Sequence, residues 1–153
     1  MEPDRRHRKS LPHNVLQVHD RKTVVFVTVC TKDRVHWLAT DLIHQELISA
    51  WQQSDRWIVG KYMIMPDHIH MFVSPIDPEI TLNNWVRYWK RVFTLSHNCR
   101  EHQWQDGYWD RTLRSKESYE SKWEYVRYNP ARHGYVEHPD EWKYQGELNV
   151  LSW

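Results

Sequence analysis

Residues 65–75 decide the predicted fold, and they read Met65-Pro-Asp-His-Ile-His-Met-Phe-Val-Ser-Pro75. The Pro-Asp pair predicts a turn, and the apolar alternation that follows predicts a strand over residues 68–74. Side chains two apart in a strand share one face of the sheet, so His68 and His70 would converge on one point. Two imidazoles on one face are suited to bind a divalent metal. The alternative is a half-exposed strand with two solvent-facing histidines and no metal.

The segments around this stretch predict alternating strands and helices. Residues 23–31 are rich in β-branched side chains and predict a strand. Residues 57–65 predict another, which the short turn joins to 68–74 as an antiparallel hairpin. The remaining predictions are helices over 41–53 (N-cap Thr40), 82–102 and 116–128 (N-cap Ser115), and an edge-like strand over 108–113. This order indicates an α+β sandwich, with a mainly antiparallel sheet and helices packed on one face.

Length and composition favour a single globular domain. The chain has 153 residues, 40% hydrophobic and 27% charged. We expect a basic arm over residues 1–20 and one domain over 21–153. No apolar run approaches the roughly 20 residues that span a bilayer, and no apolar signal segment follows the first residues. Two distant cysteines, Cys30 and Cys99, have no metal-like spacing, so we expect reduced, buried thiols in a cytoplasmic protein.

Cations and aromatic residues are grouped along the chain although the net charge is only +1. Ten tryptophans and eight tyrosines accompany the arginines. Single-stranded nucleic acid requires this combination, because bases stack on rings and phosphates pair with cations. For any single aromatic residue, packing in the core is the alternative. The candidate phosphate-binding cations are Arg5, Arg6, Arg8 and Lys9 in the arm, Arg87, Lys90 and Arg91 on one helix, and Arg111, Arg114 and Lys116 further on.

Tyr119, near the start of the last predicted helix, is a candidate nucleophile. A tyrosine hydroxyl can attack phosphorus and form a covalent phosphotyrosine. A metal at the scissile phosphate would polarise that group and stabilise the developing charge. The alternative is a structural role, in which Tyr119 packs with Trp123 and Val126 on one helix face.

Three motifs together resemble one known family. They are Met-Pro-Asp-His-Ile-His-Met-Phe-Val from Met65, Trp-Gln-Asp-Gly-Tyr-Trp-Asp-Arg-Thr-Leu-Arg-Ser from Trp104, and Tyr-Val-Arg-Tyr-Asn-Pro-Ala-Arg-His-Gly-Tyr-Val from Tyr125. In this order and separation they resemble the REP-associated tyrosine transposases, single-tyrosine members of the HUH endonuclease superfamily. The resemblance runs from about residue 23 to residue 136.

This resemblance implies a fold, an activity and a site. The fold would be a ferredoxin-like sandwich with the His pair on a central strand. His68 and His70 would hold Mg²⁺ or Mn²⁺, and Tyr119 would be the nucleophile, with Tyr125 and Tyr128 as alternatives. The reaction would cleave single-stranded DNA near a hairpin, such as a REP-like palindrome, through a 5′-phosphotyrosine. The resemblance favours a monomer, with a homodimer as the alternative.

One position departs from the family pattern. Relatives often carry a polar third metal ligand four residues after the nucleophile, and the residue four after Tyr119 is Trp123, which cannot ligate a hard cation. Water and a DNA phosphate would then complete the site, or the site is weakened, or the helix register differs. Trp123 would instead stack on a base. Asp67 would fix the hairpin turn, and Asp110 would touch metal, DNA or only Arg111.

Two other functions fit the same sequence. The first is a domesticated protein that binds hairpin nucleic acid without cleaving it, which Trp123 at the ligand position favours. The second is a metal-dependent hydrolase of small phosphate esters, which would work without Tyr119. The many arginines and aromatic residues argue against the hydrolase, because a small substrate offers little to stack on.

Overall fold

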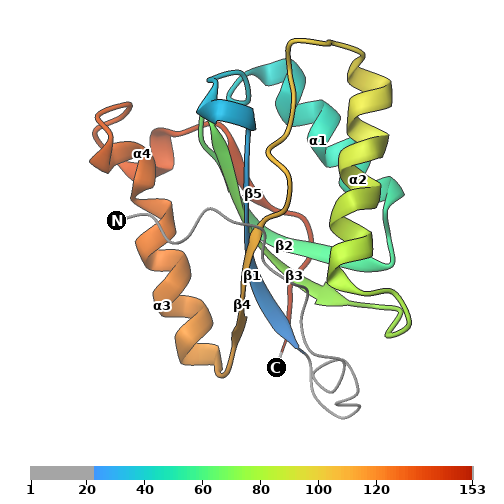
Figure 1. Cartoon of the computed structure of the whole chain (residues 1–153). Coiled ribbons are helices and arrows are strands. Elements are labelled where there is room, and N and C mark those ends of the chain that lie inside the picture. Colours follow the sequence, from blue (N-terminus) through green and yellow to red (C-terminus); the bar gives the residue numbers. More distant parts are fainter. Residues whose placement is uncertain (1–22, 153) are drawn as a thin grey trace.

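A five-stranded antiparallel sheet forms the centre of the computed structural model, which describes residues 23–152 (Figure 1). The strand order is β4-β1-β3-β2-β5. The strands are β1 Val24–Cys30, β2 Trp57–Ile64, β3 His68–Pro75, β4 Trp109–Leu113 and β5 Gln145–Glu147. The helices are α1 Asp41–Gln53, α2 Leu82–His97, α3 Lys116–Arg127 and α4 Asn129–Arg132, with short 3₁₀ turns η2 Lys32–Arg34 and η3 Pro139–Glu141.

The His-Ile-His strand lies in the middle of this sheet, as predicted. Strand β3 pairs with β1 on one side and β2 on the other. The Met65 amide donates to the His68 carbonyl at 2.8 Å and closes the β2–β3 hairpin. In the β1–β3 register Thr28 lies opposite His70, so strand β1 contributes a side chain next to the histidine pair.

Helices cover both faces of the sheet, so the prediction that they pack on one face is wrong. Helices α1 and α2 lie on one side and α3 on the other (Figure 1). One core cluster joins Val25, Val27 and Val29 to α1 and α2. A second joins Val24 and Phe26 to the α3 residues Tyr119 and Val126. Both faces of β1 are therefore buried, which explains why its sequence is apolar almost throughout instead of alternating.

Most element boundaries agree with the sequence predictions, and one helix is shorter. The Thr40 and Ser115 hydroxyls cap α1 and α3, accepting from Ile43 N and Ser118 N. Helix α2 ends at His97 instead of residue 102, because Asn98 takes a left-handed conformation (φ 54°) that ends helices. Strand β4 is an edge strand, as predicted.

The predicted basic arm, with Arg5, Arg6, Arg8 and Lys9, lies outside the described residues. Within residues 23–152, none of the helices combines the length and apolar character that a bilayer crossing requires.

Candidate active site

A cavity of about 560 Å³ opens on the α3 side of the sheet, and both His68 and His70 line it. We call it the histidine cavity. The two rings lie edge to face with their centroids 4.7 Å apart. Both side chains are partly exposed. The two imidazoles therefore share one face and converge, as the strand spacing predicts.

Each ring is fixed through its Nδ1 atom. The Asp67 carboxylate accepts from His68 Nδ1 at 2.7 Å, and Arg34 Nε donates to the same carboxylate at 2.9 Å. Thr28 Oγ1 lies 2.9 Å from His70 Nδ1. These partners leave the Nε2 atom of each ring available to a metal, the arrangement in which a carboxylate or hydroxyl orients a metal-binding histidine. Asp67 is thus more than a turn residue.

Burial favours the neutral form of His70, and neighbouring groups favour the ionised form of Asp67. Burial, followed by electrostatic interactions with His68 and Lys122, holds the pKa of His70 well below its usual value. Burial opposes ionisation of Asp67, but the hydrogen bonds and charges of His68 and Arg34 hold its pKa far below the usual range. A neutral imidazole is the form that binds a metal.

Tyr125, on α3, lines the same cavity as the two histidines. Its side chain is 64% exposed. The Arg132 guanidinium lies 4.1 Å from its ring centroid and the Lys122 ammonium 6.0 Å. Asn129, one helical turn later, also lines the cavity. The structure therefore brings a tyrosine, two histidines and an amide together.

Tyr119 does not line this cavity. It is 7% exposed and belongs to the core cluster between α3 and the sheet, with its ring 4.8 Å from that of Phe72. Burial raises its pKa to about 12. Tyr125 lies six positions further along the helix, so the two side chains leave α3 about 120° apart. The geometry favours the structural role for Tyr119.

The rest of the cavity is rich in cations and rings. Arg34, Arg111 and Lys122 line it together with the buried Asp110. Burial and then the charge of Arg111 lower the pKa of Lys122, since the two cations lie near each other. Such a surface attracts phosphate and offers rings for stacking. The aromatic residues on its wall are Phe26, His36, Trp109, His133 and Tyr135.

The other predicted DNA-binding residues lie elsewhere. Arg87 and Lys90 line a separate cavity of about 440 Å³ beside α2, and Lys90 donates to the carbonyls of Gln105 and Gly107. Arg91 is exposed on the same helix. Arg114 is exposed just before α3. Trp123 packs at the edge of the α3 core cluster, so their DNA contacts stay predictions.

The sequence carried a signal for the cavity tyrosine. A polar residue four after the nucleophile is expected, and the residue four after Tyr125 is Asn129, while the one after Tyr119 is Trp123. An amide oxygen can ligate Mg²⁺ or Mn²⁺. The spacing expected from the family resemblance is therefore met by Tyr125 and not by Tyr119. Thr28 and Arg34, by contrast, come to the site only through sheet pairing and a turn, which no local pattern reveals.

Comparison with known proteins identifies the family. The family model described as "Transposase IS200 like" matches residues 13–129, which is most of the chain. The chain belongs to the family of IS200-like transposases. The predicted resemblance is thereby confirmed at the level of the family.

Two curated relatives of this IS200-like transposase are named for the REP-associated tyrosine transposases. The Haemophilus influenzae protein is 29% identical over 135 residues, which are 78% of this chain and 76% of that protein. The Escherichia coli K12 protein is 26% identical over 87 residues, 56% of this chain and 52% of its own length.

A solved structure of a REP-associated tyrosine transposase bound to a REP hairpin shares the fold of this IS200-like transposase. The TM-score is 0.71 at 22% identity, covering 95% of this chain and 82% of that one. The α+β sheet predicted from the sequence is confirmed by this likeness.

Proposed function

We propose that this protein is a metal-dependent single-stranded DNA nuclease and strand transferase, with Tyr125 instead of Tyr119 as its nucleophile. One observation carries the proposal: Tyr125, Asn129 and the two histidines line a single cavity. Membership of the IS200-like transposase family supports the reaction class.

The donor set fits a hard divalent metal. His68 and His70, oriented by Asp67 and Thr28, would supply two nitrogens, and Asn129 would supply an amide oxygen. Imidazole and oxygen ligands suit Mn²⁺ and Mg²⁺. When bound, the metal would polarise the scissile phosphate and stabilise the charge that develops on it.

Tyr125 would attack the phosphorus atom of a DNA phosphate. Its phenolic oxygen forms a bond to phosphorus, and the bond from phosphorus to the 3′ oxygen breaks. The tyrosine proton passes to water, and the leaving oxygen gains a proton as a free 3′-hydroxyl. The 5′ end stays on Tyr125, and attack by another 3′-hydroxyl reverses the step and joins two strands.

We propose hairpin DNA with a single-stranded flank as the substrate. The related structure was solved with a REP hairpin, and the cavity of this chain combines the cations Arg111 and Lys122 with several rings. The cations would hold phosphates, and the rings would stack on unpaired bases. Binding without cleavage, the alternative function, rested on Trp123 at the ligand position, and it loses that support when Asn129 occupies the position.

The experiment is a cleavage assay on a labelled pool of DNA hairpins whose flanks are randomised. We expect a protein–DNA adduct and a free 3′ end with Mn²⁺ or Mg²⁺ and neither product with EDTA. His70→Ala should lose both products and Tyr119→Phe should keep them. Hairpin binding without either product would instead support the non-cleaving alternative.

A further inference from the structure

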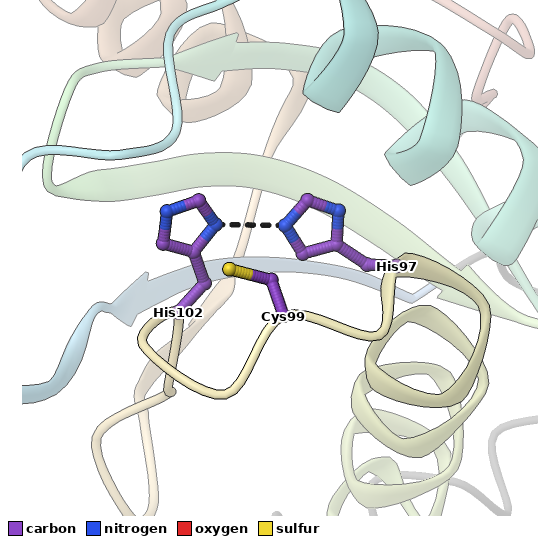
Figure 2. Close-up of side chains that lie close together, drawn as sticks. All are labelled: His97, Cys99 and His102. Carbon is purple, nitrogen blue, oxygen red and sulfur yellow. Dashed lines mark hydrogen bonds between the residues drawn. The ribbon is translucent and has the colours of Figure 1, made fainter.

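A second group of metal-binding side chains lies where α2 ends, outside the histidine cavity. His97 is the last residue of α2, and Cys99 and His102 follow in the next turn (Figure 2). One donor atom from each of the three lies within 4.8 Å of the other two. We call these three residues the α2-end cluster. None of them lines the histidine cavity.

The two histidines of this cluster are already oriented by hydrogen bonds. His97 Nδ1 lies 2.7 Å from the Glu46 carboxylate on α1, and its Nε2 lies 2.7 Å from His102 Nδ1 (Figure 2). A carboxylate that accepts from one ring nitrogen fixes the other nitrogen as the metal-binding atom. Glu46 therefore prepares His97 Nε2 for a ligand, as Asp67 prepares His68 across the sheet.

Aromatic packing holds the rings in place. The Trp37 ring is parallel to that of His102 with centroids 4.6 Å apart, and Phe93 stacks on His97 at 5.0 Å. Cys99 and His102 are half-buried, while the His97 side chain is only 8% exposed, so an ion would reach the cluster from the side of Cys99 and His102. The expectation that both cysteines are buried thus holds for Cys30 but not for Cys99.

We propose that the α2-end cluster binds Zn²⁺ through His97 Nε2, the Cys99 thiolate and His102 Nδ1, with water as the fourth ligand. Thiolate and imidazole ligands select zinc over Mg²⁺ or Mn²⁺. In a tetrahedral site two zinc-bound nitrogens lie about 3.3 Å apart, so the rings need to separate slightly from 2.7 Å. Binding releases the thiol proton to solvent, and the proton on His102 Nδ1 moves to Nε2 of the same ring, which frees Nδ1 to bind the ion.

Such a site would have a structural role. It would tie the end of α2 to residues 98–108, which lead into β4. That segment pairs with the start of η2, through the Thr31–Trp104 bridge and the Lys32 amide donating to the Gln103 carbonyl at 2.9 Å. The same turn carries Arg34, which holds Asp67. Zinc would therefore stabilise the segment that supports one wall of the histidine cavity.

Without a metal, the Glu46–His97–His102 hydrogen bonds would still order this segment. Cys99 would then contribute only the hydrogen bond from its thiol to the Glu101 carboxylate at 3.4 Å. Cobalt distinguishes the two cases, because Co²⁺ replaces Zn²⁺ and absorbs visibly when a thiolate binds it. The full chain should be titrated with Co²⁺ as the His68→Ala/His70→Ala variant, which removes the other candidate metal site. The result is then independent of the proposed DNA chemistry.

We expect one equivalent of Co²⁺ to bind with a thiolate charge-transfer band, and Zn²⁺ to displace it. Cys99→Ser, in the same background, should lose the band, and His102→Gln should weaken binding at least tenfold. The matched control His138→Gln, an exposed histidine elsewhere, should change neither. A band that survives Cys99→Ser, or no band in the parent, would overturn the proposal.

A stability measurement keeps the test valid if a variant folds poorly. Cys99→Ser should melt at the parent's temperature in EDTA, which shows an intact fold. Zn²⁺ should raise the melting temperature of the parent but not that of Cys99→Ser, because only the parent binds the ion in its folded state. Equal shifts in both proteins would contradict a site that uses Cys99.

Discussion

Thr28 and Asp67 each orient one of the two histidines in the histidine cavity. Each occupies one Nδ1 atom, so that each ring presents Nε2 to the cavity. They come from different parts of the sheet, β1 and the β2–β3 turn, and they use different chemistry. A hydroxyl orients His70, while a carboxylate also adds negative charge beside His68. The affinity for metal should therefore depend on residues that never touch it.

Thr28→Val tests this dependence with little change in shape. The variant keeps the volume of the side chain and removes the hydroxyl beside His70. We expect the affinity for Mn²⁺, measured by calorimetry, to fall about 10- to 100-fold. Thr112→Val on the neighbouring strand β4 is the matched control and should bind Mn²⁺ like the parent. Equal affinities in both variants would show that Thr28 does not position His70.

The direction of a side chain could be predicted from the sequence where the residue lies in a strand. The period of two in β3 was sufficient to place His68 and His70 together, because neighbouring strands do not alter which face a side chain takes. The tyrosines were harder. Tyr119 and Tyr125 share one helix, and which of them faces the core depends on how α3 packs against β2 and β3. In the sequence, only the polar residue Asn129, four positions after Tyr125, distinguished Tyr125 from Tyr119.

At the scale of the element, helix α2 carries one cation turned inward. Lys90 donates to the carbonyls of Gln105 and Gly107 at 3.1 and 3.0 Å and thereby ties the segment before β4 to the helix. Burial lowers its pKa to about 8. This role as a tie between two segments competes with the predicted phosphate contact.

Lys90 should make stability depend on pH. Burial lowers the pKa of Lys90 from its ordinary value of 10.5 to about 8 in the fold, so between these two pH values the unfolded chain binds more protons. The free energy of unfolding should therefore rise with pH in this window, by on the order of 1–3 kcal/mol. Urea unfolding at several pH values, compared with Lys90→Met, measures the contribution. A difference between the two proteins that stays constant from pH 8 to 10.5 would contradict it.

Helices could be predicted closely where capping residues and an apolar stripe mark them. The caps Thr40 and Ser115 and the apolar stripes placed α1 and α3 closely. The end of α2 was predicted five residues too late. The polar residues after His97 were compatible with a longer helix, although the apolar periodicity had already ended. Strand β5, with only three residues, forms because β2 offers an open edge, and such pairing leaves no pattern of its own.

At the scale of the whole molecule, the two faces of the sheet carry different groups of residues. The α3 face holds the histidine cavity, Tyr125 and the cations around them. The face covered by α1 and α2 holds the larger core cluster, and the α2-end cluster packs beside it. The apolar sequence of β1 already indicated two covered faces, but strand patterns do not say which helix covers which face. The one-face prediction failed for this reason.

This arrangement predicts that DNA binds on the α3 face of the sheet. Arg111→Ala/Lys122→Ala removes two cations from the cavity, and the salt slope of hairpin binding should fall by about 0.7 for each lost phosphate contact with a single strand. Arg87→Ala/Arg91→Ala removes the same charge from the α2 face and should leave the slope nearly unchanged. Fluorescence anisotropy at several salt concentrations measures both. A larger effect of the α2 pair would move the DNA path to that face.

The identity of the nucleophile is tested most directly by locating the DNA on the chain. Trypsin separates the three candidate tyrosines, because Lys116, Lys122, Arg127 and Arg132 place Tyr119, Tyr125 and Tyr128 in peptides 117–122, 123–127 and 128–132. The adduct formed with Mn²⁺ is digested with nuclease and trypsin and analysed by mass spectrometry. The nucleotide should remain on peptide 123–127 and be lost in Tyr125→Phe. A nucleotide on peptide 117–122 or 128–132 would contradict the assignment of Tyr125.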